Sequence, residues 1–162
     1  MLSRQMIYAA AISALGAIAP IAGFAENLFY GSPISVADAK SVAAAAIVEK
    51  RKLHLEMTIA MVDSGSNLVY LERSDQAGIG TTDPAIGKAK AANGIKAPTK
   101  AIQDAILSQS QIHLLAVPGA FPVEGGVPLI IDGKVVGAIG ASGGMPSYDG
   151  AAATAGANIL LQ

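Results

Sequence analysis

The stretch IIDGKVVGAIGASGG, residues 130–144, places an Asp-Gly pair between two aliphatic runs. Asp132-Gly133 separates the run Val127 to Ile131 from the run Val135 to Ile139. An Asp-Gly pair readily adopts the positive φ angles of a two-residue type I′ turn, which joins antiparallel strands. The stretch therefore predicts a β-hairpin, and the fold must contain an antiparallel sheet.

The glycines of this stretch do not match a phosphate-binding loop. A Walker-type loop needs Lys and then Ser or Thr directly after its last Gly, but Gly144 is followed by Met145 and Pro146. The spacing of a dinucleotide fingerprint is absent as well. Glycines inside a strand, such as Gly137 and Gly140, indicate the close approach of another backbone or of a flat ligand. A bulge or tight packing under a helix is the simpler interpretation.

Upstream, the pattern predicts a helix and a second hairpin. Ser35 and Asp38 resemble a capping box, and apolar residues at helical spacing extend the helix from about Val36 to Lys52. The β-rich runs Thr58 to Val62 and Leu68 to Glu72 are joined by turn-forming residues. These segments place a hairpin directly after the first helix.

Three more helices are expected. Asp83-Pro84 starts one that stops near Asn93-Gly94, and Pro98-Thr99 starts another that runs to about Gln109. A final helix begins near Asp149. An antiparallel sheet combined with helices defines a single α+β domain, and no repeat or linker divides it.

The first 25 residues differ from the remainder. Arg4 is their only charge, an apolar stretch follows it, and Gly23-Phe24-Ala25 puts small residues at the −3 and −1 positions of a cleavage site. This is typical of a secretory signal peptide. We therefore expect a signal peptide over residues 1–25 and a mature domain over 26–162, located in the periplasm or secreted. An uncleaved membrane anchor is the alternative, which the glycines and proline inside the apolar run disfavour.

Composition limits the partners of the mature chain. The 162 residues carry 11 basic and 12 acidic side chains, so removing Arg4 changes the net charge from −1 to −2, which gives no electrostatic footprint for nucleic acid. With no Cys, the exported chain folds without disulfides and carries no lipid anchor. Many alanines and few aromatic residues predict a core of modest volume. Burial between subunits, and hence a homo-oligomer, is therefore expected.

The chain has two histidines, far apart in sequence. His54 follows a basic run at the end of the first predicted helix, where a cation interacts favourably with the helix dipole. His113 lies in the run Ile112 to Leu115, a predicted strand entry, as a sheet histidine or a pocket residue. Neither lies in a nucleophile motif, and their separation matches no metal-ligand spacing.

Charged residues around the first hairpin and the second helix have structural and functional interpretations. Asp63 is expected to close its turn by accepting backbone N–H bonds, and Arg73 could pair with Asp75 on the surface. Lys88 lies beside a face of small residues, where a lysine extends to solvent or binds an anion. By spacing it is the best candidate for binding an anion.

Taken in order, several segments resemble a known family: VDSGSNLVYLERSDQAG (62–78), IGKAKAA (86–92), Pro98-Thr99, PGAFPVEGGVPLIIDGKVVGAIGASGG (118–144) and YDGAAATAGA (148–157). Together they are similar to the GlcG/HbpS-type haem-binding family, over nearly the whole mature chain. The resemblance implies an antiparallel sheet of about five strands flanked by helices. It also implies homo-oligomers, often octamers, and exported members that bind haem or act as accessory sensors, some of them described as haem-degrading. The matching positions are Asp63, Gly65, Arg73, Asp75, Lys88, Thr99, Pro118, Gly119, Gly125, Gly126, Pro128, Gly133, Gly137, Gly140, Ser142, Gly143 and Asp149.

The same resemblance locates a haem site near the segment before the first helix and near the Pro118–Gly126 loop. Residues 27–33 contain Tyr30 but no His, Met or Cys, and the loop offers only Glu124. Tyrosine can ligate ferric haem. We therefore take Tyr30 and His113 as candidate iron ligands, and Lys88 as a third candidate cofactor-binding residue.

Three functions follow as hypotheses. The first is a haem-binding or haem-sensing oligomer with Tyr30 or His113 near the iron. The second is an enzyme for a small anionic molecule, in which Lys88 or Arg73 binds a carboxylate and Asp63 or His113 moves a proton. The third is a scaffold that binds a partner such as the ectodomain of a sensor protein.

Overall fold

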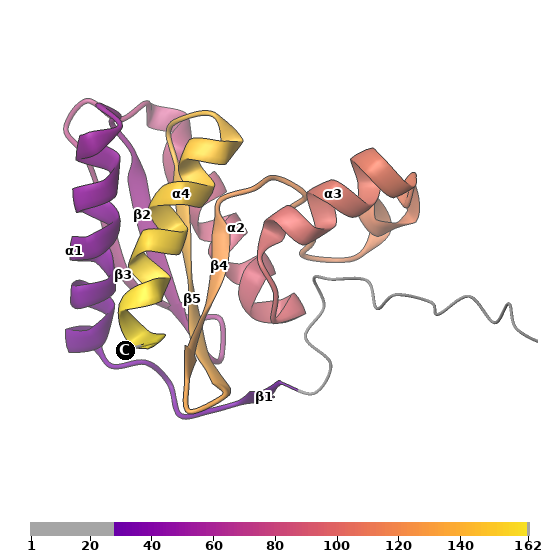
Figure 1. Ribbon diagram of the computed structural model, residues 1–162, viewed down its shortest axis with the longest axis horizontal. Helices are drawn as coiled ribbons and strands as arrows, with labels where there is room; N and C mark the ends of the chain where they lie inside the picture. The colour runs from indigo at the N-terminus through magenta and orange to yellow at the C-terminus, as the bar shows by residue number, and fades with distance from the viewer. Residues whose placement is uncertain (1–27, 162) are drawn as a thin grey trace, which may run out of the picture.

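The computed structural model describes residues 28–161, which form a sheet covered by helices on both faces (Figure 1). Helices α1 (Val36–Lys52) and α4 (Pro146–Ala157) pack together on one face, and α2 (Thr82–Ile95) covers the other. The larger core lies under α1 and α4 and includes Met57, Met61 and Ile139. The predicted signal peptide, residues 1–25, lies outside the described residues.

The sheet has five strands, and β5 (Lys134–Ser142) is central to it. It pairs antiparallel with β4 (Gly126–Ile131) and with β2 (Thr58–Asp63), which in turn pairs with β3 (Leu68–Arg73). Both predicted hairpins are confirmed. The β4–β5 turn has φ of 51° at Asp132 and 70° at Gly133, as a type I′ turn requires.

One strand makes the sheet mixed rather than wholly antiparallel. The two-residue β1 (Phe29–Tyr30) pairs parallel with the start of β5, at Lys134 and Val135. Two residues are too few to show a periodic pattern, so the sequence analysis did not predict this strand. The fold is otherwise the predicted α+β domain.

The helices begin and end close to the predicted positions. The Oγ of Ser35 accepts a hydrogen bond from the backbone N–H of Asp38 at 3.1 Å, which caps α1 as expected. Helix α3 spans Thr99–Gln109, as predicted. Helix α2 continues to Ile95 and ends on Lys96 in the left-handed conformation, while α4 begins at Pro146, three residues before the predicted start. Pro146 suits the first turn because its missing N–H has no partner there.

Two glycines of β5 allow close approach of other backbone segments, and one of them, Gly140, lets α2 lie directly on the sheet. A Cβ at Gly140 would overlap the carbonyl oxygen of Ala85 and lie 2.7 Å from the backbone nitrogen of Ala89, both on α2. A Cβ at Gly137 would overlap the carbonyl oxygen of Val62. Close packing of protein backbone therefore explains both glycines, and a flat ligand is not needed.

Helix α3 and the 3₁₀ helix η2 (Ile112–Ala116) project from the sheet and its covering helices as an arm (Figure 1). His113 lies on η2, so the predicted strand entry is wrong. The backbone N–H of Leu114 bonds to Gln111, and that of Val117 bonds to Leu114, so this segment uses local partners. A short apolar run cannot be assigned to a strand by pattern alone. Between residues 28 and 161, no helix combines the length and apolarity needed to cross a membrane.

Candidate functional site

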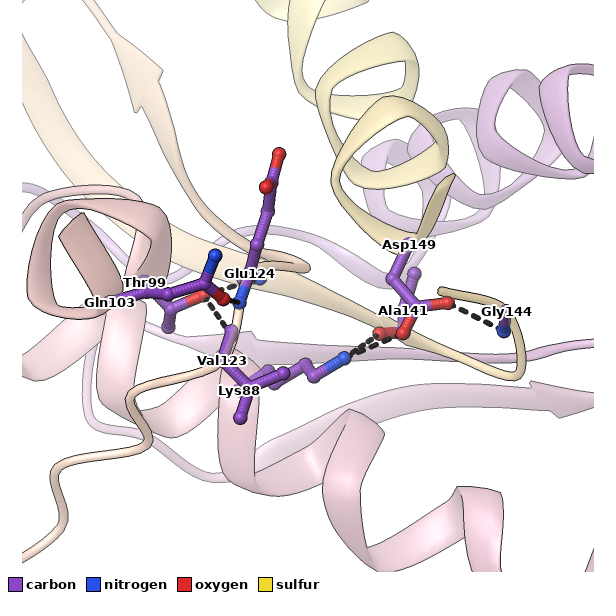
Figure 2. Close-up of polar contacts among 9 residues, drawn as sticks. Lys88, Thr99, Gln103, Val123, Glu124, Ala141, Gly144 and Asp149 are labelled. Carbon is purple, nitrogen blue, oxygen red and sulfur yellow. Dashed lines mark hydrogen bonds and ion pairs between the residues drawn. The ribbon is translucent and has the colours of Figure 1, made fainter. Parts of the chain in front are cut away.

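A buried ion pair joins the two covering layers beside the end of β5. The ammonium of Lys88 on α2 lies 2.7 Å from Oδ2 of Asp149 on α4, and both side chains are 3% exposed. Figure 2 shows this ammonium also donating to the carbonyl of Ala141, at 3.1 Å. Lys88 therefore neither extends to solvent nor presents its charge at the surface. The anion that it binds is part of the same chain.

The carboxylate of Asp149 also fixes the turn that leads into α4. Its Oδ1 accepts the backbone N–H of Gly144 at 2.8 Å (Figure 2). Burial raises the pKa of Asp149 above its ordinary value, opposed by hydrogen bonds from Lys88 and the Gly144 N–H. The pair thus ties α2, β5 and α4 together where three elements meet. This geometry is suited to positioning rather than to proton transfer with a solvent-borne substrate.

A second set of polar contacts fastens the long loop before β4 to the arm. The hydroxyl of Thr99 donates to the carbonyl of Val123 at 2.7 Å and accepts the N–H of Gly126 at 2.9 Å. Nearby, the Gln103 side chain accepts the N–H of Glu124 at 2.8 Å (Figure 2). These contacts fix the Pro118–Gly126 loop against α3. The loop is therefore positioned by buried and partly buried hydrogen bonds near the Lys88–Asp149 pair.

Tyr30 lies at a different place, against the end of α2. Its hydroxyl donates to the carbonyl of Asn93 at 2.9 Å, and the ammonium of Lys96 lies 4.6 Å from the centre of its ring. Lys96 also donates to the carbonyl of Leu28 at 2.6 Å. The side-chain Oδ1 of Asn93 is buried without a hydrogen-bond partner among the described residues. This group of residues fastens the segment before α1 to the end of α2.

His113 lies on the arm among exposed apolar side chains. Leu107 is 75% exposed, Ile112 69% and Leu115 62%. His113 itself is exposed, and its imidazole makes no hydrogen bond within residues 28–161. Large contiguous apolar patches are uncommon on monomeric soluble domains, whereas single exposed apolar side chains are normal. Patches of this kind mark sites of ligand or protein binding.

The remaining candidates have structural roles. Oδ1 of Asp63 accepts the backbone N–H of Asn67 at 2.9 Å and closes the β2–β3 turn, as predicted. Arg73 donates to the carbonyl of Ala77, so the predicted surface pair with Asp75 is not formed among the described residues. His54 lies just after α1 with φ of 54°, and its N–H donates to the carbonyl of Arg51. Residues 28–161 contain no cluster of three or more His, Asp or Glu that could hold a metal ion.

The three predicted cofactor-binding residues thus lie in three separate settings. Lys88 is in the interior, Tyr30 is at the end of α2 and His113 is on the arm. The sequence analysis did not find the partnership of Lys88 with Asp149, because 61 residues separate them and no periodic pattern connects them. Both residues are among the positions that match the family, and this match was the hint in the sequence that they could act together. Lys96 is not among those positions, so the sequence offered no such hint of its contacts with Leu28 and Tyr30.

The comparisons with known proteins agree with this fold. A protein of Citrobacter freundii, described as an uncharacterized 15.0 kDa protein in the dhaT-dhaS intergenic region, is 30% identical over 119 residues, or 72% of this chain and 84% of that protein. The crystal structure of Klebsiella pneumoniae ORFY is 28% identical with a TM-score of 0.75, covering 81% of this chain and 92% of ORFY.

Two further solved structures are those of an HbpS double mutant and of a complex with haem. A double mutant of Streptomyces reticuli HbpS is 30% identical with a TM-score of 0.73, covering 89% of this chain and 98% of HbpS. The PduOC:heme complex is 22% identical with a TM-score of 0.69, covering 78% of this chain and 94% of PduOC, and it shows a shared fold. The family model for the haem degrading protein HbpS-like matches residues 34–158. The chain therefore belongs to the HbpS-like family.

Proposed function

We propose that this chain is an exported, oligomeric haem-binding protein that carries haem or reports its presence to a sensor. The observation that supports this proposal best is the open imidazole of His113 within the apolar surface of the arm. Haem combines a broad apolar ring with an iron that accepts histidine nitrogen. Membership of the HbpS-like family supports the same choice of ligand.

The donor groups differ in how well they suit haem. The imidazole of His113 has no competing hydrogen bond among the described residues, and the apolar side chains of Leu107, Ile112 and Leu115 could cover the ring. Tyr30 is the second candidate, but its hydroxyl already donates to Asn93 and would have to give up that bond. Lys88 is given no contact with haem in this proposal, because its ammonium is enclosed by Asp149 and Ala141.

Each part of the arm would have a distinct task. His113 would hold the iron through a neutral ring nitrogen, while the neighbouring leucine and isoleucine side chains would exclude water from the ring. Bound haem would supply a redox-active iron, which suits sensing as well as degradation. The Thr99 and Gln103 contacts keep the loop beneath the arm fixed, so the patch would be preformed rather than assembled on binding.

Haemin titration of the mature chain, residues 26–162, tests the site. We expect a saturable shift of the Soret band that His113→Ala abolishes or weakens at least about tenfold, the effect of losing one strong interaction. His54→Asn is the matched control, since it removes the other exposed histidine and keeps a residue that tolerates positive φ. Loss of binding in Tyr30→Phe with normal binding in His113→Ala would move the ligand to Tyr30. Absence of any saturable shift in the wild type would refute haem binding.

Export and sensing need separate measurements. Expression of all 162 residues in a bacterium with a periplasm should yield a periplasmic chain whose amino terminus is Glu26. Recovery of the uncleaved chain in the membrane fraction would contradict export. For sensing, the haem-loaded and haem-free proteins should differ in affinity for the ectodomain of a sensor protein encoded by the same host, and equal affinities would contradict that role.

A further inference from the structure

The molecule has a pocket away from the arm, next to Lys96. Its volume is about 250 Å³. Four segments line it: Leu28 before β1, Lys96 to Pro98 between α2 and α3, part of β4 from Val127 to Ile130, and the end of α4 with the chain that follows it. Apart from Lys96 and Asn158, the side chains that line it are apolar.

The ammonium of Lys96 is a cation without a counter-ion in the described structure. The ion pairs within residues 28–161 join Lys50 to Glu56, Lys52 to Glu49, Lys88 to Asp149 and Lys100 to Asp104. Lys96 instead meets the carbonyl of Leu28 and the ring of Tyr30. An ammonium has three N–H donors, and the Leu28 carbonyl takes one of them. A half-buried positive charge of this kind favours an anion at the pocket.

The backbone at Lys96 favours glycine. The residue has φ of 54°, a left-handed conformation that glycine adopts more easily than lysine. This position follows the end of α2, where glycine is the usual choice. His54, Ser66, Ser110 and Asp132 have positive φ as well, so the conformation does not single out Lys96, but it makes glycine a mild replacement for it.

From these observations we propose that the pocket binds a short aliphatic monocarboxylate, with Lys96 pairing with its carboxylate and the apolar walls enclosing its tail. At about 250 Å³, the pocket has room for a short acyl chain, and a six-carbon acid is a suitable probe of it. A dicarboxylate or a sugar acid would place several polar groups against Val127, Pro128 and Ile130, which costs binding free energy, because Asn158 is the one further polar side chain among the described residues that line the pocket. This site does not depend on haem binding at His113.

The test uses hexanoate as the probe and calorimetric titration of the mature chain at low ionic strength. We expect saturable binding with a Kd in the millimolar range or below. Acetate, which has the charge without the tail, and hexan-1-ol, which has the tail without the charge, should each bind at least about tenfold more weakly. Equal binding of hexan-1-ol, or no saturable binding of hexanoate, would overturn the proposal.

Two variants separate the pocket from folding. Lys96→Gly removes the ammonium at a backbone conformation that favours glycine, so the thermal unfolding curve should remain cooperative while hexanoate binding weakens at least about tenfold. Lys90→Gln is the matched control, because Lys90 is an exposed lysine of α2, the helix that Lys96 caps, and its loss changes the net charge equally. Ile130→Phe should block the cavity and keep the ammonium, so it too should lose hexanoate. Unchanged affinity in Lys96→Gly would overturn the assignment.

The carboxylates of haem are a second source of an anion that would pair with Lys96. Haemin added to the hexanoate complex distinguishes the two sources, and we expect hexanoate to remain bound. Displacement of hexanoate by stoichiometric haemin would overturn the assignment to a free acid. Failure of the Soret titration leaves the hexanoate result unaffected, so the two proposals can fail separately.

Discussion

At the scale of single residues, the Lys88–Asp149 pair shows how one contact orders several elements. Both charges are out of water, so each depends on the other for compensation. A buried pair of this kind contributes little net stability relative to apolar side chains, but removing one partner leaves an uncompensated charge. Its value here is positional, because it sets the turn at Gly144 and the direction of α4.

We predict that Asp149→Asn lowers the free energy of unfolding by about 3 kcal/mol or more, because the Lys88 ammonium stays buried without its anion. The double change Lys88→Met with Asp149→Leu should recover part of that loss, since neither charge remains but the Gly144 N–H and the Ala141 carbonyl lose their side-chain partners. Urea denaturation measures both. Asp104→Asn is the control: it breaks the half-exposed pair with Lys100 on α3 and should cost under about 0.5 kcal/mol. Equal losses of unfolding free energy in Asp149→Asn and Asp104→Asn would contradict the prediction that the buried pair costs more to break than the exposed one.

At the scale of elements, the contact between α2 and β5 depends on glycine. Gly140 brings the backbone of the helix against the backbone of the strand, and alanines at 85, 89 and 92 line the same contact. The layer spacing is therefore set by missing side chains rather than by large ones. This explains how a chain with few aromatic residues fills its interior.

Gly140→Ala should destabilise the domain by about 2 kcal/mol or more, because the new methyl overlaps the carbonyl of Ala85 and the layers must separate. Gly94→Ala makes the same chemical change in the last turn of α2, where a Cβ meets nothing within 4 Å. That variant should gain up to about 1 kcal/mol from helix propensity. Thermal unfolding of the two proteins should therefore shift in opposite directions. Shifts of the same sign would contradict this account of the packing.

At the scale of the whole molecule, the arm exposes apolar side chains to water. Leu107, Ile112 and Leu115 lie exposed on a segment that projects from the covered sheet (Figure 1). Burial between copies of the chain would remove this surface from water, which is favourable in proportion to its area. The homo-oligomer proposed above, an octamer by analogy with the family, would bury the part of this surface that haem leaves exposed.

Native mass spectrometry of the mature chain should therefore report an oligomer. We predict that Leu107→Glu shifts the population towards smaller species, because a charge on the arm opposes burial between copies. The change should leave the unfolding midpoint of the isolated subunit nearly unaffected, because the Leu107 side chain is largely exposed and contributes little to the core. The exposed Val48 of α1 offers the control, and Val48→Glu should not change the distribution. A wild-type chain that is monomeric at micromolar concentration would contradict the prediction.

The sequence by itself determined the local structure of this protein. Asp132-Gly133, the capping residues Ser35 and Asp38, and the alternation of apolar runs fix turns, caps and strands, because these depend on the backbone preferences of neighbouring residues. Only the tertiary structure decided the rest. It placed His113 on a 3₁₀ helix, paired Lys88 with Asp149, added the short parallel β1 and set Lys96 beside a pocket. The last three depend on contacts between residues distant in sequence, for which burial and charge compensation, rather than local preference, select the arrangement. The 3₁₀ helix has local hydrogen bonds, but a short apolar run in the sequence does not distinguish it from a strand.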